Sequence, residues 1–138
     1  PYVWESLKAF NVSMEIIPKG YHLFVDNLIM PETRKWTASF YPPHIQQTRE
    51  RLVNEAKARC SGFTTDAQRI YLTRKKRGLR CVENEDEVIN TLEKYKFNAL
   101  TFEDLSIWEQ ILLMNNSSCF VSLHGAGYSN IMFMKPGS

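Results

Sequence analysis

The stretch "FVSLHGAGYSN", residues 120–130, passes from an apolar run into a histidine, two glycines and polar residues. The apolar run predicts a buried strand over residues 119–123, and the residues that follow predict a helix over 126–134. Small residues at such a junction let a ligand approach the backbone, and the first N–H groups of a helix favour an anion. Close packing of the helix against the strand would require the same small residues.

Working back along the chain, strands and helices alternate with short connections. The apolar and polar patterns predict two further strands, 69–73 and 97–102, and two further helices, 84–96 and 105–116. Asn84 and Ser106 are the expected N-caps of these helices. This alternation predicts a parallel sheet with right-handed crossovers and flanking helices. The fold class is therefore α/β and Rossmann-like, as a single domain over residues 1–138.

The first 62 residues carry a less distinctive pattern. Helical spacing of apolar residues predicts a helix within 3–12, and a second over 44–58 that is opened by two prolines. Apolar, β-branched and aromatic runs bounded by proline and glycine predict strands at 14–17 and 21–30. We interpret this part as the lead-in to the regular region 69–138.

Composition excludes several classes of protein. The chain has 138 residues, of which 43% are hydrophobic and 23% charged, which is typical of a soluble globular domain with a real core. No apolar run approaches the roughly 20 residues of a membrane span. Three scattered cysteines suit neither a disulfide framework nor a zinc knuckle, and we expect buried thiols. The chain begins at Pro1 and stops at "KPGS", so we expect it to be part of a longer protein.

Two unusual loops should meet at one edge of the predicted sheet. In an open parallel sheet, ligands bind beyond the carboxyl ends of the strands. There the chain places "RKKRGLR", residues 74–80, after one strand and "HGAG", residues 124–127, after another. Arg74 and Arg80 can grip phosphate oxygens with their planar guanidinium groups, and His124 adds a donor. Together these residues predict a diphosphate site.

Each of these features would also fit a simpler role. A basic run can be a solvated loop, and a lone histidine can be a hydrogen-bonded structural residue. Nucleic-acid binding is not favoured, because no aromatic residues interleave with the basic ones to form a stacking platform. A dinucleotide-binding fingerprint would need G-x-G-x-x-G, and "GAGYSN" lacks the third glycine.

The span from about residue 69 to residue 138 resembles glycosyltransferase family 61. That family shows a strand ending in Arg, a basic loop with a second Arg, Asn-Glu opening a helix, and later a helix with Gln. A strand then leads to His-Gly-Ala-Gly, followed by Asn and a Pro-Gly pair. The matching positions here are Arg74, Arg80, Asn84, Glu85, Gln110, His124, Gly125, Ala126, Gly127, Asn130, Phe133, Pro136 and Gly137.

The resemblance implies a GT-B architecture, in which two Rossmann-like domains face each other across a cleft. This chain would form most of the C-terminal, nucleotide-binding half, and the missing N-terminal domain would be its partner. Such enzymes are inverting and need no metal or other cofactor. A transferase without a metal must offset the charge of the departing diphosphate with arginine, histidine and helix-terminal N–H groups.

The site residues implied by the resemblance fall into two groups. Those expected to bind the diphosphate are Arg74, Arg80, His124, Gly125, Ala126 and Gly127. Asn130 is expected to fix the following turn, Asn84 to support the site, and Glu85 either to cap its helix or to bind ribose or base. We assign no catalytic residue and no metal ligand. The general base is expected from the missing domain.

The expected function is transfer of a sugar from a nucleotide-sugar donor to a hydroxyl of a glycan or polysaccharide acceptor. A non-catalytic nucleotide-binding or scaffold domain is the alternative. We expect no nucleic-acid partner. A peripheral membrane association of the longer parent protein is compatible with the sequence. The expected location is the bacterial cytoplasm or, for a eukaryotic protein, the lumen of the Golgi or endoplasmic reticulum.

Overall fold

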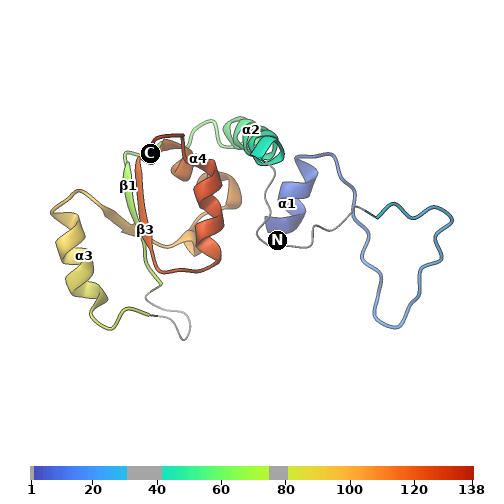
Figure 1. Ribbon diagram of the computed structural model, residues 1–138, viewed down its shortest axis with the longest axis horizontal. Helices are drawn as coiled ribbons and strands as arrows, with labels where there is room; N and C mark the ends of the chain where they lie inside the picture. The colour runs from blue at the N-terminus through green and yellow to red at the C-terminus, as the bar shows by residue number, and fades with distance from the viewer. Residues whose placement is uncertain (1, 31–41, 75–80) are drawn as a thin grey trace.

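The computed structural model describes residues 2–30, 42–74 and 81–138 (Figure 1). Its elements, in chain order, are α1 (Tyr2–Lys8), α2 (Pro42–Arg59), β1 (Arg69–Leu72), α3 (Glu85–Glu93), β2 (Asn98–Leu100), η1 (Phe102–Asp104), α4 (Ile107–Asn116), β3 (Cys119–Ser122) and η2 (Ala126–Phe133), where η marks a 3₁₀-helix. The predicted helices at 44–58, 84–96 and 105–116 are confirmed as α2, α3 and α4, with shifted ends.

The three strands form one parallel sheet in the order β2-β1-β3. Ile70 of β1 lies opposite Asn98 of β2 and Phe120 of β3. Helix α3 covers one face, while α4 and α2 lie on the other (Figure 1). The Rossmann-like α/β fold is therefore confirmed. The chain passes from β1 to β2 on one side of β1 and then crosses to β3 on the other side, so the order in which strands are added reverses between β1 and β3.

The hydrophobic core lies between the sheet and the α2–α4 layer. Ile70 from β1 and Ile111 and Met114 from α4 are its largest completely buried side chains. Leu52, Val53 and Ala56 of α2 pack into the same cluster, and they share one helix face as their spacing predicts. The Arg59 guanidinium at the end of α2 lies 4.8 Å from the centre of the Trp108 ring of α4. These contacts fix α2 across α4.

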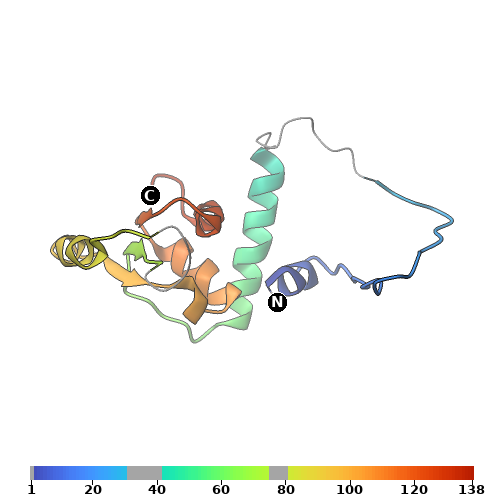
Figure 2. The same cartoon turned by 90° about the horizontal axis from the view of Figure 1, so that it is seen from below.

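Helix α1 is joined to this core at its carboxyl end. Ala9, just after α1, is buried in the hydrophobic cluster. The Nε of Arg51 in α2 donates a hydrogen bond of 2.8 Å to the Ala9 carbonyl. Since α2 is itself packed on α4, this bond holds α1 beside the body of the domain (Figure 2).

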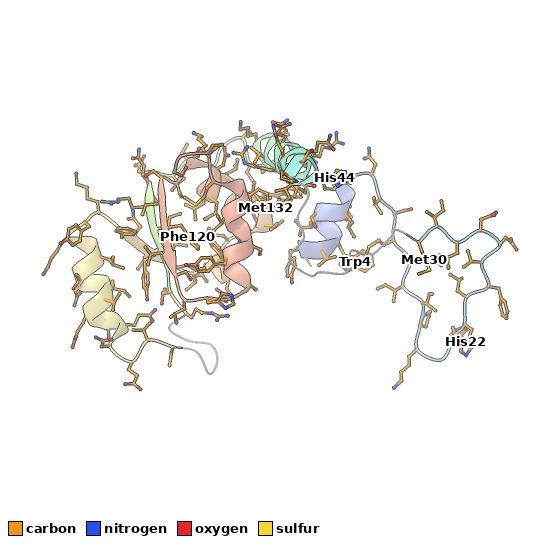
Figure 3. The ribbon with its side chains drawn as sticks, viewed as in Figure 1. Trp4, His22, Met30, His44, Phe120 and Met132 are labelled. Atoms are coloured by element: carbon orange, nitrogen blue, oxygen red, sulfur yellow. The ribbon has the colours of Figure 1, made fainter. Side chains whose placement is uncertain are left out.

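The strands predicted at 14–17 and 21–30 are wrong. Residues 13–30 form an exposed, irregular arm that leads away from the sheet, and Figure 3 shows His22 and Met30 along it. Phe24 is 97% exposed and Ile29 92% exposed. Within the described residues this arm has no neighbouring strand, and a strand needs partners for its backbone groups. Apolar and β-branched side chains in residues 13–30 are therefore not sufficient to form a strand without a partner strand.

The ends of the last βα unit also differ from expectation. The helix predicted over 126–134 is a 3₁₀-helix, which begins with a hydrogen bond of 3.0 Å from the Tyr128 N–H to the Gly125 carbonyl. The strand before it is only half-buried, because it lies at the edge of the sheet; Val121 is 37% exposed.

Cys60 and Cys119 are half-buried and Cys81 is exposed, so the expectation of three buried thiols is wrong. No helix in the described ranges is long and apolar enough to span a membrane.

Candidate functional site

Arg74 and Gly125 meet at the carboxyl edge of the sheet. Arg74 follows β1 and Gly125 follows the neighbouring strand β3. A Cβ atom placed on Gly125 would lie 2.9 Å from Nη1 of Arg74 and 3.1 Å from its Cζ. Among the described residues the Arg74 guanidinium has no ion pair. Arg74 and Gly125, one from each of the two loops predicted to share this edge, are therefore in contact.

A cavity of about 570 Å³ opens beside this contact. It extends over the carboxyl ends of all three strands and under one side of α1. The residues that line it are Tyr2, Glu5, Leu72, Thr73, Arg74, Phe102, Glu103, Leu105, Ser106, Ile107, Gln110, Ala126, Gly127, Ser129 and Asn130. Its size falls in the range of pockets that hold small ligands and cofactors, roughly 300–1,000 Å³.

Gly127 brings η2 close to the end of β1. A Cβ atom at Gly127 would lie 2.6 Å from Cδ2 of Leu72 and 3.6 Å from Cδ2 of Phe102. A side chain at this position would have to displace buried groups, so glycine lets the first turn of η2 lie against the sheet. Gly127 and Ala126 both line the cavity. The packing of η2 against Leu72 therefore requires a small residue at position 127.

His124 does not line this cavity. Its side chain is exposed, and its ring centre lies 6.2 Å from that of Tyr128. The Tyr128 hydroxyl in turn donates to the Ser122 carbonyl, at 3.3 Å. The structure thus places His124 at the same sheet edge as Arg74 but outside the cavity lining. Arg80, the second predicted arginine, lies outside the described residues.

Glu85 occupies a buried position on the opposite face of the sheet. Its Oε1 accepts a hydrogen bond of 2.9 Å from the Tyr71 hydroxyl, and only 5% of the residue is exposed. Burial, together with the hydrogen bond and charge of Glu85, raises the pKa of Tyr71 to about 12. Neither role expected for Glu85 fits this geometry, because its carboxylate joins α3 to β1. Asn84 stands at the N-cap position, but its side chain donates to Glu87 at 3.2 Å instead of capping the helix.

Asn130 belongs to a hydrogen-bond network beneath the cavity. Its Nδ2 donates to Oε1 of Gln110 at 3.3 Å, and Nε2 of Gln110 donates to the carbonyls of Phe102 and Leu105 at 2.8 and 3.0 Å. One glutamine thus connects η2, α4 and the loop after β2. Through Gln110, Asn130 is thus joined to α4 and to the loop after β2.

Comparison with known protein families identifies the family of this chain. The family described as glycosyltransferase 61 matches residues 4–138. The chain belongs to glycosyltransferase family 61. The match covers residues 4–62 as well as the motif region, so the less distinctive lead-in is part of the same family domain.

A curated relative of this family 61 chain is the EGF domain-specific O-linked N-acetylglucosamine transferase of Drosophila melanogaster. It is 33% identical over 67 residues, which are 46% of this chain and 13% of the relative. The chain thus spans a small part of the length of the relative it matches. No solved structure matches the chain significantly.

The cavity of this family 61 domain is also lined by residues that the sequence did not indicate as site residues. Phe102, Glu103 and Leu105 follow β2, and Tyr2 and Glu5 come from α1. The position of Phe102, Glu103 and Leu105 at the end of a predicted strand did indicate this edge, because any loop after a parallel strand reaches the ligand-binding edge. The loop after β2 has an ordinary composition, unlike the loops after β1 and β3. Among the described residues, no group of three or more His, Cys, Asp or Glu side chains is arranged to hold a metal ion.

Proposed function

We propose that this domain binds the nucleotide-sugar donor of a glycosyltransferase, which transfers the sugar to a hydroxyl of a glycan or polysaccharide acceptor. The observation that carries the proposal is the Arg74 guanidinium, which lies against Gly125 in the lining of the 570 Å³ cavity. Membership of family 61 supports glycosyl transfer as the reaction class.

A diphosphate fits this end of the cavity for electrostatic reasons. An arginine can form paired, charge-assisted hydrogen bonds with phosphate oxygens, and these bonds are roughly twice as strong as neutral ones. Thr73, Arg74, Ala126 and Gly127 line the cavity where β1 and η2 approach each other. Between β1 and β3 the order in which strands are added to the sheet reverses, and ligands of open α/β folds bind at such a point. Arg74 lines the cavity at this point.

We further propose that the reaction is inverting and needs no metal. The departing diphosphate would be stabilised by Arg74 and by the backbone of the turn at residues 124–127, which is the task that a metal ion performs in other transferases. The rest of a GT-B enzyme would close over the open side of the cavity and supply the acceptor site and the general base. We assign no catalytic residue to this chain.

Thermal shift with nucleoside diphosphates tests the proposal on the full-length protein. At a concentration 100 times the Kd, a ligand that binds only the folded state adds about 2.7 kcal/mol of stability. We expect a clear rise in Tm with at least one of UDP, GDP, CDP and ADP, and the same rise in the presence of EDTA. The absence of a shift with all four would contradict donor binding, and a shift abolished by EDTA would contradict metal independence.

An NMR assay of the product tests the reaction itself. Transfer of sugar with inverted anomeric configuration, measured with EDTA present, is the expected result. A protein that binds nucleoside diphosphates tightly and transfers nothing to glycan acceptors would instead be the non-catalytic nucleotide-binding domain.

A further inference from the structure

We propose that Glu103 accepts hydrogen bonds from the ribose hydroxyls of the donor, so that the nucleoside lies over the carboxyl end of β2. This inference rests on the proposed function, because it concerns the orientation of the ligand whose diphosphate lies at Arg74. It assigns a binding role to a residue in the third loop of the sheet edge.

The position of Glu103 in the fold is the first argument. Glu103 lies in η1 directly after β2, and Arg74 directly follows β1. The two strands are paired in parallel, so both residues stand at the same edge on neighbouring strands. In Rossmann-like nucleotide sites, phosphate lies at the end of one strand, and an acidic side chain about 20 residues on in the chain hydrogen-bonds the ribose. Glu103 lies further along the chain from β1 than that spacing. It nevertheless occupies the equivalent place in the fold, at the end of the strand next to β1.

The lining of the cavity is the second argument. The loop after β1 and the start of η2 supply the cationic and small residues, whereas the loop after β2 supplies Glu103 between Phe102 and Leu105. A carboxylate repels a diphosphate but accepts hydrogen bonds from sugar hydroxyls. The apolar side chains of Phe102 and Leu105 offer a surface for a nucleobase. One orientation of the ligand satisfies all three groups.

Other acidic residues of α3, α4 and the loop after β2 are hydrogen-bonded within the protein, and Glu5 is differently placed. Glu85 is buried against Tyr71, Glu109 accepts from the Ser106 N–H at 2.8 Å, and Asp104 accepts from the Thr101 hydroxyl. The Glu103 carboxylate, by contrast, has no hydrogen-bond or ion-pair partner within the described residues. Glu5 is the second carboxylate of the lining, but it lies on α1 and not at the end of a strand.

The test compares a ribonucleoside diphosphate with its 2′,3′-dideoxy analogue by calorimetry on the full-length protein. The probe is the tightest binder among UDP, GDP, CDP and ADP. We expect the wild-type protein to prefer the ribose form by about tenfold, the value of a hydrogen bond to a charged group. Glu103→Ala should bind both forms with the affinity that the wild type shows for the dideoxy form. Asp104→Ala, the matched control from the same turn, should keep the preference.

Each outcome separates this inference from the proposed function. Arg74→Ala should weaken both ligands by the same factor, because it acts on the diphosphate. A wild-type protein that binds both forms equally well would overturn the role of Glu103 while leaving donor binding intact. Retained preference in a folded Glu103→Ala protein, or its loss in Glu5→Ala instead, would overturn it too. Failure to bind any nucleoside diphosphate would refute the proposed function, and this inference with it.

Discussion

The guanidinium of Arg74 lies so close to Gly125 that a Cβ atom there would stand 2.9 Å from Nη1. The backbone of Gly125 is extended, with φ 173°, a conformation open to any residue. The need for glycine therefore comes from the arginine and not from the backbone. Since the side chain that must move is flexible, a larger residue should displace Arg74 without unfolding the protein.

Substitutions at this contact should weaken nucleotide binding and leave stability nearly unchanged. Arg74→Ala removes a charge-assisted contact of about 1.5–3 kcal/mol, which corresponds to a loss of about tenfold or more in nucleoside diphosphate affinity. Gly125→Ala and Gly125→Val should lower the affinity progressively as the side chain grows. Calorimetry measures the affinities. Gly62→Ala is the control, because nothing lies within 4 Å of a Cβ atom at that glycine.

Gly127→Ala should affect stability, in contrast to Gly125. Its Cβ would lie 2.6 Å from Cδ2 of Leu72, which is buried. Overpacking of this kind costs about 1–3 kcal/mol. Leu72→Ala alone should cost about 2–5 kcal/mol, and the double variant should cost less than the sum, because each change relieves the other. Urea denaturation of the four proteins gives the coupling energy; strict additivity would show that the two residues do not touch.

Tyr71→Phe should reveal the buried pair with Glu85. It leaves a buried carboxylate without its hydrogen-bond donor, at a cost of about 1–3 kcal/mol at neutral pH. Glu85→Gln keeps an acceptor for the Tyr71 hydroxyl and should cost less. Equal stability of Tyr71→Phe and wild type in urea denaturation would contradict the pairing.

The same pair predicts a difference at high pH. The pKa of Tyr71 rises from 10.0 to about 12 in the folded protein, so the folded state holds this proton more tightly. The stabilisation is fully present below the unfolded pKa and is lost as the pH rises toward the folded pKa. Wild-type stability should therefore fall more steeply than that of Tyr71→Phe between these values.

The regular half of the fold was predictable because its signals are local. The strand at 69–73, the prolines at the start of α2 and the Ser106 cap before α4 all depend on near neighbours in the sequence. The strands expected at 14–17 and 21–30 depend on a partner strand, which side-chain pattern does not report. The close approach of η2 to Leu72 at Gly127 involves two residues far apart in the chain, which a local pattern does not report.

The candidate site was predictable to the extent that its loops had unusual composition. Arg74 and the turn at residues 124–127 were recognisable, and the parallel sheet brings them together. Glu85 was expected to cap its helix or to bind ribose or base; only the fold brings the Tyr71 hydroxyl within hydrogen-bond distance of its carboxylate. Glu103 was missed because nothing around it in the sequence is unusual; its place after β2 makes it notable.

Limited proteolysis should cut the arm before the core. Tyr21 and Phe24 are exposed and lie in irregular backbone, whereas Phe102 and Phe133 are buried. Exposed irregular segments are cleaved without global unfolding. A low dose of chymotrypsin on the 138-residue chain should therefore cleave within 13–30 first, as read by mass spectrometry. First cleavage at Phe102 or Phe133 would contradict the described core.

The Ser106 cap should contribute to stability in a pH-dependent way. The Ser106 hydroxyl accepts from the Glu109 N–H at 3.3 Å, and Oε2 of Glu109 accepts from the Ser106 N–H at 2.8 Å, so the pair forms a capping box. Interaction of the Ser106 hydroxyl with the Glu109 carboxylate, followed by the hydrogen bond from the Ser106 N–H, lowers the pKa of Glu109 below its ordinary 4.5. The stabilisation from a lowered pKa is present above the ordinary value and is lost as the pH falls through the folded one.

Ser106→Ala should therefore cost about 1 kcal/mol at neutral pH, and less once Glu109 is protonated. Ser106→Thr keeps the hydroxyl and is the matched control. Urea denaturation at pH 7 and at pH values below 4.5 measures both effects. Because Ser106 also lines the cavity, nucleoside diphosphate affinity should be followed in the same variants. A Ser106→Ala protein as stable as the wild type at pH 7 would show that α4 does not depend on this cap.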